Sequence, residues 1–192
     1  MKLWKRDRFT GIKPLNGSVI TGKKISLREK KLSDVREDYD WQTDEELSEL
    51  DAAPKLEMAF SVYLLDYSTR FRHKDHNHFP LGIETLDGKH IGNCTCYEIN
   101  PRKAEAQVGI MIGDKNYWNK GYGADVLNTL VGYIYDTSSF NRLYLKTLDW
   151  NKRAQKCFAK CGFTFCGTLK RDSYKFLLME LKREDWEKRR GK

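Results

Sequence analysis

No apolar segment in this chain of 192 residues approaches the roughly eighteen residues that a membrane-spanning helix needs. The N-terminus is charged and lacks the apolar stretch of a secretory signal. The five cysteines are odd in number and lack the spacing of a disulfide framework, which favours a reducing compartment. We therefore expect a cytoplasmic protein without a membrane segment.

Two common nucleotide-binding signatures are also missing. No Gly-x-x-x-x-Gly-Lys-[Ser/Thr] segment exists, and the Gly121-x-Gly123 pair lacks the third glycine of the dinucleotide fingerprint. What the sequence does have is 40% hydrophobic and 12% aromatic residues, both as shares of the whole chain, which is typical of a globular protein. We expect one domain at residues 23–192, preceded by a basic extension at residues 1–22.

Positive charge is concentrated at the two ends of the chain. The formal net charge is +8; residues 1–24 contribute +6, residues 182–192 contribute +3, and the rest sums to −1. Charged ends are commonly solvated tails. An alternative function is a module that contacts the ribosome or RNA through these ends, for which binding with a steep salt dependence would be the mark.

Residues 108–134 have the pattern of a strand, a glycine-containing turn and a helix. β-Branched residues alternate over 108–112, and from residue 121 the apolar positions recur at helical spacing. Gly121 and Gly123 would let a bulky anion approach the backbone where a Cβ would block it. The first N–H groups of the helix would point at the same spot. The pattern therefore predicts an anion-binding turn.

Periodicity and turn residues predict a mixed α/β layout for the rest of the chain. Strands are expected at residues 24–28, 79–86, 89–99, 104–112, 143–148, 163–169 and 175–182. Helices are expected from Ser33-Asp34, from Thr43, from Pro54, at 121–136, at 152–161 and at 183–190.

Two motifs resemble those of one superfamily. Trp118-x-x-Gly121-x-Gly123-Ala124 resembles the pyrophosphate-binding motif of the GNAT N-acetyltransferases. Asn151-x-x-Ala154-x-x-x-Phe158-x-x-x-Gly162-Phe163 resembles their second signature, a strand end followed by a helix that ends in Gly-Phe. The two occur in the order of the superfamily, and the resemblance covers residues 23–186. It is closest to the branch of ribosomal-protein alanine and polyamine acetyltransferases.

The resemblance implies a fold and a reaction. The fold would be a central, mostly antiparallel sheet of about seven strands flanked by helices, with the fourth and fifth strands splayed apart. The co-substrate would be acetyl-CoA, without a metal. The acetyl group would pass to a primary amine by direct attack in a ternary complex. The acceptor would be a protein N-terminus, a polyamine or another cationic small molecule, and the enzyme a monomer or a homodimer.

The resemblance also assigns the CoA contacts. The expected cofactor-binding residues are Ile110, Met111, Ile112, Trp118, Asn119, Lys120, Gly121, Tyr122, Gly123, Ala124, Asn151 and Phe158. Backbone groups of residues 110–112 would pair with the pantetheine arm, and one N–H would face the developing oxyanion. Asn151 would cap its helix and could also reach the ligand through its amide.

The groups that would move protons depart from the family pattern. Phe158 stands where many relatives carry a tyrosine acid, and Gln107 stands where relatives of this branch often carry a glutamate. Our catalytic candidates are Glu105 and Asn151, with Glu98 as an alternative base acting through water. An exposed strand carboxylate without a catalytic role is the competing interpretation. The departures leave open a CoA-binding protein without catalytic activity.

Three other groups of residues were considered. Five acids in residues 44–51 would attract a cationic acceptor or form a solvated helix face. The histidines of residues 73–78 lie in a polar connection without an apolar frame. The pairs Cys94/Cys96 and Cys157/Cys161 are typical of buried packing residues. No metal site is expected.

Overall fold

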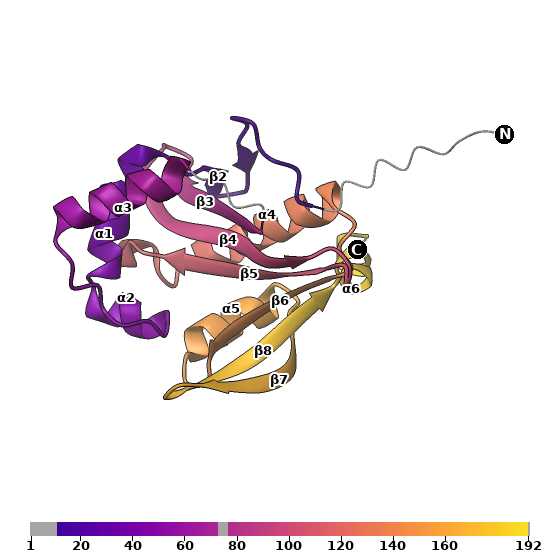
Figure 1. Ribbon diagram of the computed structural model, residues 1–192. Coiled ribbons are helices and arrows are strands. Elements are labelled where there is room, and N and C mark those ends of the chain that lie inside the picture. Colours follow the sequence, from indigo (N-terminus) through magenta and orange to yellow (C-terminus); the bar gives the residue numbers. More distant parts are fainter. Residues whose placement is uncertain (1–10, 73–76, 192) are drawn as a thin grey trace.

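The computed structural model describes residues 11–72 and 77–191, in which eight strands form one sheet of order β1-β2-β3-β4-β5-β6-β8-β7 (Figure 1). The strands are β1 (Ile20–Thr21), β2 (Ile25–Glu29), β3 (His78–Thr85), β4 (His90–Asn100), β5 (Glu105–Ile112), β6 (Arg142–Leu148), β7 (Thr164–Arg171) and β8 (Tyr174–Lys182). The α-helices are α1 (Val35–Gln42), α2 (Glu45–Leu50), α3 (Phe60–Arg72), α4 (Tyr122–Thr137), α5 (Lys152–Lys160) and α6 (Arg183–Arg190). Two 3-10 turns lie at Leu32–Asp34 and Lys115–Tyr117.

The sheet divides between β5 and β6, its one parallel pair. Glu105–Gln107 pair with Arg142–Tyr144, and the ladder ends there. Beyond this point the two strands diverge, as Figure 1 shows. The fourth and fifth predicted strands correspond to β5 and β6, because the two-residue strand β1 was not predicted. The predicted splay between them is thereby confirmed.

The main core lies between the sheet and helices α4 and α5. The buried face of α4 comprises Val126, Leu127, Leu130, Val131, Ile134 and Tyr135, which matches the helical spacing seen in the sequence. Alternating residues of β2 to β6 meet them, and Cys94 and Cys96 belong to this core as expected. Ile12 and Leu15 of the N-terminal extension are also buried in it. Residues 1–10 lie outside the described part of the chain.

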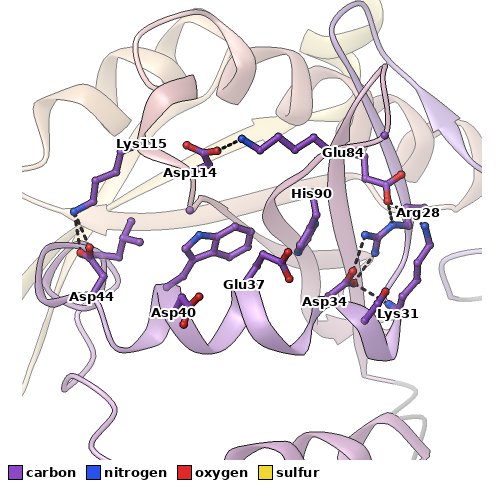
Figure 2. Close-up of a pocket in the computed structure, with 16 residues that line it drawn as sticks. Arg28, Lys31, Asp34, Glu37, Asp40, Asp44, Glu84, His90, Asp114 and Lys115 are labelled. Atoms are coloured by element: carbon purple, nitrogen blue, oxygen red, sulfur yellow. Dashed lines mark hydrogen bonds and ion pairs between the residues drawn. The ribbon is translucent and has the colours of Figure 1, made fainter. Parts of the chain in front are cut away.

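On the opposite face, buried charged groups hold the start of α1 against the sheet (Figure 2). Arg28 is 4% exposed; it donates to Asp34 at 2.6 Å and 2.7 Å and to Glu84 at 2.7 Å. A Cβ on Gly82 would lie 2.2 Å from Nη1 of Arg28, so a side chain there would displace the guanidinium. The absence of a side chain at Gly82 therefore leaves room for the Arg28 guanidinium to extend over β3 and reach Glu84.

Asp38 of α1 is the centre of a second buried group. Lys30 Nζ lies 2.7 Å from one carboxylate oxygen, and Asn93 donates to the other at 2.7 Å. Burial alone would raise the pKa of Asp38, but the hydrogen bonds from His90 and Asn93 and the charge of Lys30 lower it to about 2. The carboxylate is thus ionised wherever the protein is folded near neutral pH, and it positions α1.

One predicted helix start was wrong. We expected a helix from Pro54, but α3 begins at Phe60. The preceding segment uses its backbone in tertiary contacts instead: Leu56 N–H donates to Gln42 C=O at 2.9 Å, which ties it to the end of α1. The other predicted boundaries lie within two residues of the observed ones.

Candidate functional site

The turn before α4 presents backbone N–H groups without a side chain to cap them. Gly121 is the N-cap residue, with φ of 84°, and no side-chain hydrogen bond caps this helix. Asn119 is also left-handed, with φ of 59°. The first N–H groups of an α-helix have no partner inside the helix, and the helix dipole adds positive potential there. The geometry is that of an anion-binding turn.

A cavity of about 270 Å³ adjoins this turn, bounded by β5, the start of α4, α5 and the end of α2. Of the residues predicted to bind the cofactor, it is lined by Ile110, Met111, Ile112, Trp118, Asn119, Gly121, Tyr122, Gly123, Ala124, Asn151 and Phe158. Lys120 is the exception. Its side chain is exposed, and its carbonyl accepts a hydrogen bond from Lys24 Nζ at 3.0 Å.

The edge of β5 that faces the splay supplies backbone groups to the cavity. Ala104 C=O accepts from Asn141 at 2.7 Å and from Arg142 at 3.3 Å, on the β6 side. Because backbone groups alternate in direction along a strand, the C=O of Val108 and both backbone groups of Ile110 point to the same side, beyond the last pair of the β6 ladder at Gln107–Tyr144, and Ile110 lines the cavity. They are available to an extended, amide-containing ligand.

Arg153 of α5 is a cationic lining residue that the sequence analysis did not select. Its guanidinium carbon lies 3.5 Å from the ring centroid of Trp118, whose indole N–H donates to Ile112 C=O at 2.7 Å. Desolvation lowers the pKa of Arg153, and Glu46 is near enough to oppose that shift. The available signal was a basic residue two positions after Asn151, in the first turn of the helix. The stack holds a positive charge at the cavity wall.

The α5 residues of the second motif form the opposite wall. Asn151 Oδ1 accepts from Ala154 N–H at 3.1 Å, so its predicted role as a helix cap is present. Phe158 is 7% exposed and packs against Phe163, with ring centroids 6.5 Å apart. Cys161 is buried as expected, whereas Cys157 is half-buried and lines the cavity.

Glu105 does not lie at the cavity. It sits where β5 and β6 are still paired, and its carboxylate accepts from Arg142 Nη1 at 2.7 Å. It is absent from the residues that line the cavity. The carboxylate of Glu105 is thus occupied by an ion pair with Arg142. The sequence did not reveal this ion pair, because Arg142 lies on another strand, far along the chain.

A group of polar side chains from β4, β5 and β6 lies around the last pair of the β5–β6 ladder, Gln107–Tyr144. Gln107 is buried, and its amide donates to the Tyr97 hydroxyl. Glu98 adopts φ of 49° at a bulge in β4 and accepts from the Tyr144 hydroxyl at 2.8 Å. A non-glycine residue in the left-handed region costs about 1–3 kcal/mol, and such strain is concentrated at functional sites.

Asp51 brings the end of α2 to this group. It is the C-cap residue of α2 and lines the cavity. The Asp51 residue is exposed at the surface, but the surrounding protein partly desolvates its carboxyl group. This desolvation raises the pKa of Asp51, and the positive charge of Lys146 opposes the rise. Burial, followed by the charges of Glu98 and Asp51, raises the pKa of Tyr97 to about 12. Both carboxylates are therefore near enough to Tyr97 to affect its ionisation.

A second cavity, of about 720 Å³, lies between α1 and the turns that follow β3 and β5 (Figure 2). Ion pairs close its rim: Lys89 to Asp114 at 2.7 Å and Lys115 to Asp44 at 2.8 Å. Trp41 and the buried Arg28 group form its floor. It is larger than the first cavity but is lined by no residue of the turn at Gly121, whereas residues of both motifs line the smaller cavity.

Over residues 11–72 and 77–191, no group of three or more His, Cys, Asp or Glu side chains is arranged to hold a metal ion. None of the helices in these ranges combines the length and apolar character needed to cross a membrane. His73 and His76 lie outside the described residues.

Comparisons with known sequences point to one family. Residues 24–164 match the family model described as an acetyltransferase (GNAT) domain. A segment of 94 residues is 26% identical to an uncharacterized N-acetyltransferase p20 of Bacillus licheniformis. The match covers 49% of this chain and 52% of that protein, so the chain matches about half of the length of this curated relative.

Solved structures share the fold at low sequence identity. A spermidine N-acetyltransferase from Vibrio cholerae, in complex with CoA and spermine, has a TM-score of 0.75 at 19% identity, over 85% of this chain and 98% of its own. The aminoglycoside acetyltransferase AAC(6')-Ib, in complex with coenzyme A, has a TM-score of 0.71 at 19% identity, over 86% of this chain and 99% of its own.

Proposed function

Because this chain belongs to the GNAT acetyltransferase family, we propose that it transfers the acetyl group of acetyl-CoA to a primary amine. One observation carries the proposal: the uncapped turn at Gly121 and the unpaired edge of β5 border the same cavity. An elongated ligand with a pyrophosphate at one end and two amides in its arm needs both features at once.

The residues present fit CoA. The N–H groups at the start of α4 would bind the pyrophosphate, with Arg153 adding charge from α5. The free edge of β5 at Val108 and Ile110 would pair with the pantetheine amides, which leaves the thioester near the apex of the splay. A β5 N–H group there would donate to the thioester oxygen as negative charge develops on it.

The amine would attack the thioester carbonyl directly. Phe158 has no proton to give, so the departing thiolate would be protonated by solvent; a thiol with a pKa of about 8.5 is a fair leaving group near neutral pH. Asp51 is our candidate for accepting the amine proton, because its raised pKa brings it nearer to working pH. Glu98 lies in the same group and would bind the cationic end of the acceptor.

We propose a small polycationic amine as the acceptor, in preference to a protein N-terminus. Glu98 and Asp51 make no ion pair within the described part of the chain. On the helix that ends at Asp51, Asp44 and Glu46 pair with Lys115, whereas Glu45 and Glu49 add exposed carboxylates. Such a surface attracts a flexible cation. The two structural neighbours named above act on a polyamine and on aminoglycosides. On the basis of cysteine usage, we further propose a cytoplasmic location.

The test is thiol release from acetyl-CoA with a panel of acceptors: spermidine, kanamycin, and peptides that begin with Ala or Ser. Release stimulated by spermidine or kanamycin supports the proposal, and release stimulated only by a peptide transfers the assignment to protein N-termini. Tight CoA binding by calorimetry without turnover on any acceptor identifies a CoA-binding protein without catalysis. Absence of both turnover and CoA binding refutes the proposal.

A further inference from the structure

The turn that joins β1 to β2 lies against the first turns of α4. The carboxylate of Asp125 accepts two backbone N–H groups from it, that of Lys23 at 3.1 Å and that of Lys24 at 2.7 Å. A Cβ on Gly22 would lie 2.5 Å from Thr129 Oγ1 and 2.7 Å from Asp125 Oδ2, so a side chain there would force the two segments apart. The β1–β2 turn is therefore held closely against the start of α4.

From the β1–β2 turn, the side chain of Lys24 reaches the anion-binding turn. Its ammonium group donates to the carbonyl oxygen of Lys120 at 3.0 Å. The ammonium nitrogen also lies 5.4 Å from the ring centroid of Tyr122, the first residue of α4, which is within the range of a cation–π contact. The carbonyl that accepts from Lys24 belongs to the peptide group between Lys120 and Gly121. Lys24 thus contacts the backbone of the turn itself.

The orientation of this peptide group decides where its N–H points. Gly121 has φ of 84°, and glycine takes other values of φ at little steric cost, so the peptide plane before it can rotate unless a contact holds it. In a trans peptide the C=O and N–H groups point in opposite directions. Because the carbonyl of Lys120 is held on the side of Lys24, the N–H of Gly121 points away from Lys24. Gly121 lines the cavity, and Lys24 is absent from its lining.

We propose that Lys24 is a positioning residue of the CoA site: its ammonium group fixes the peptide between Lys120 and Gly121 so that the N–H of Gly121 faces the bound pyrophosphate. Hydrogen bonds in a chain polarise one another, so donation to the carbonyl also makes the N–H of the same peptide a stronger donor. The role in CoA binding rests on the proposed function, whereas the orientation of the peptide group does not.

The binding experiment titrates CoA into the full-length protein and three variants by calorimetry. Lys24→Met removes the ammonium group and keeps a long side chain, and Lys24→Arg restores a cationic donor at the same position. Lys23→Met is the matched control, because it removes the same charge one residue away. The Lys23 side chain is exposed, and it is the backbone N–H of Lys23 that donates to Asp125. The control thus separates the contact with the peptide group from the loss of one positive charge.

A second measurement observes the peptide group directly, in the protein without CoA. The amide nitrogen resonance of Gly121 is recorded by NMR for the wild type and the same three variants. A hydrogen bond to the Lys120 carbonyl changes the electron distribution over the whole peptide group, so the nitrogen of Gly121 reports on it. Lys24→Met should shift this resonance, Lys24→Arg should return it toward the wild-type position, and Lys23→Met should leave it in place.

Lys24→Met should raise the Kd for CoA about fivefold, a modest effect because the contact is exposed to solvent. Lys24→Arg and Lys23→Met should stay within about twofold of the wild type. An unchanged Kd in Lys24→Met overturns the inference, as does an equal rise in Lys23→Met, which would show an effect of charge alone. A raised Kd without a shift of the Gly121 resonance also overturns it, because Lys24 would then act on the ligand directly. A shifted resonance in a protein whose wild type does not bind CoA instead refutes the proposed function.

Discussion

Gly123→Val tests the anion-binding turn most directly. Gly123 lies in the first turn of α4 with an ordinary helical backbone, and a Cβ there would lie 3.4 Å from Cys157 Sγ and 3.9 Å from Ile110 Cδ1. Both are normal contact distances, so the fold has room for the added carbon. Replacing a helical glycine by a residue with a side chain gains up to about 1 kcal/mol, partly offset by the β-branch of valine.

The cost appears in ligand binding instead. The valine methyl groups would enter the cavity at the point where a phosphate group must approach the N–H groups of the turn. A hydrogen bond to a charged group contributes about 1.5–3 kcal/mol. Loss of one such contact raises the Kd for CoA by about 10- to 150-fold. The free energy of unfolding, measured in urea, should change by less than about 1 kcal/mol.

Gly132→Val is the matched control for this substitution. Gly132 lies in the same helix, and a Cβ there would meet no atom within 4 Å. Calorimetric titration with CoA should give a wild-type Kd for Gly132→Val and a strongly raised one for Gly123→Val. If both variants are folded and their Kd values agree within about twofold, the backbone at Gly123 does not contact the cofactor and the assignment of the turn is wrong.

Three further predictions concern charged groups. Arg153→Met should raise the Kd for CoA about tenfold, while Arg153→Lys keeps most of the affinity; equal affinity in all three proteins would exclude Arg153 from the site. The raised pKa of Asp51 predicts that kcat/KM rises with pH above the ordinary carboxyl range, as Asp51 loses its proton. Asp51→Asn should abolish this rise, and Glu49→Gln on the same helix should retain the rise. An unchanged pH profile in Asp51→Asn rules out Asp51 as the base. Asp38 has a pKa of about 2 in the folded protein, below its ordinary value, so its ionised form adds about 2 kcal/mol to the free energy of unfolding. This contribution is complete above about pH 4 and is lost as the pH falls from about 4 to about 2. Urea unfolding of Asp38→Asn should lack this acid-induced loss, and a loss identical to that of the wild type would contradict the prediction.

Features encoded by local residue types were predictable from the sequence. Gly121 and Gly123 between a β-branched strand and an apolar helical repeat predicted the turn, and the structure has it with a left-handed Gly121. The helix cap at Asn151 followed from the same kind of local rule. These features depend on residues a few positions apart, where sequence spacing determines geometry.

Features that depend on distant partners were not predictable. Glu105 is engaged by Arg142 on another strand, and Asp51 joins the site only because α2 ends beside β5. Arg153 is held by stacking on Trp118, a contact between two segments that no spacing rule connects. The segment 54–59 has helix-forming residues, but the backbone N–H of Leu56 donates to Gln42 at the end of α1. In each case tertiary contacts outweighed local preference.

The short parallel ladder between β5 and β6 affects how the whole molecule unfolds. In the described residues, the ladder that joins the half of the sheet formed by β1 to β5 with the half formed by β6, β8 and β7 has three residue pairs. Cooperativity between the halves therefore depends heavily on α4 and α5, which pack across the seam. A ligand whose arm lies along β5 would substitute for the missing rungs and fasten the two halves together. Amide protons on both sides of the seam would then exchange more slowly and at more similar rates. Ligand binding would thus also stabilise the connection between the two halves of the sheet.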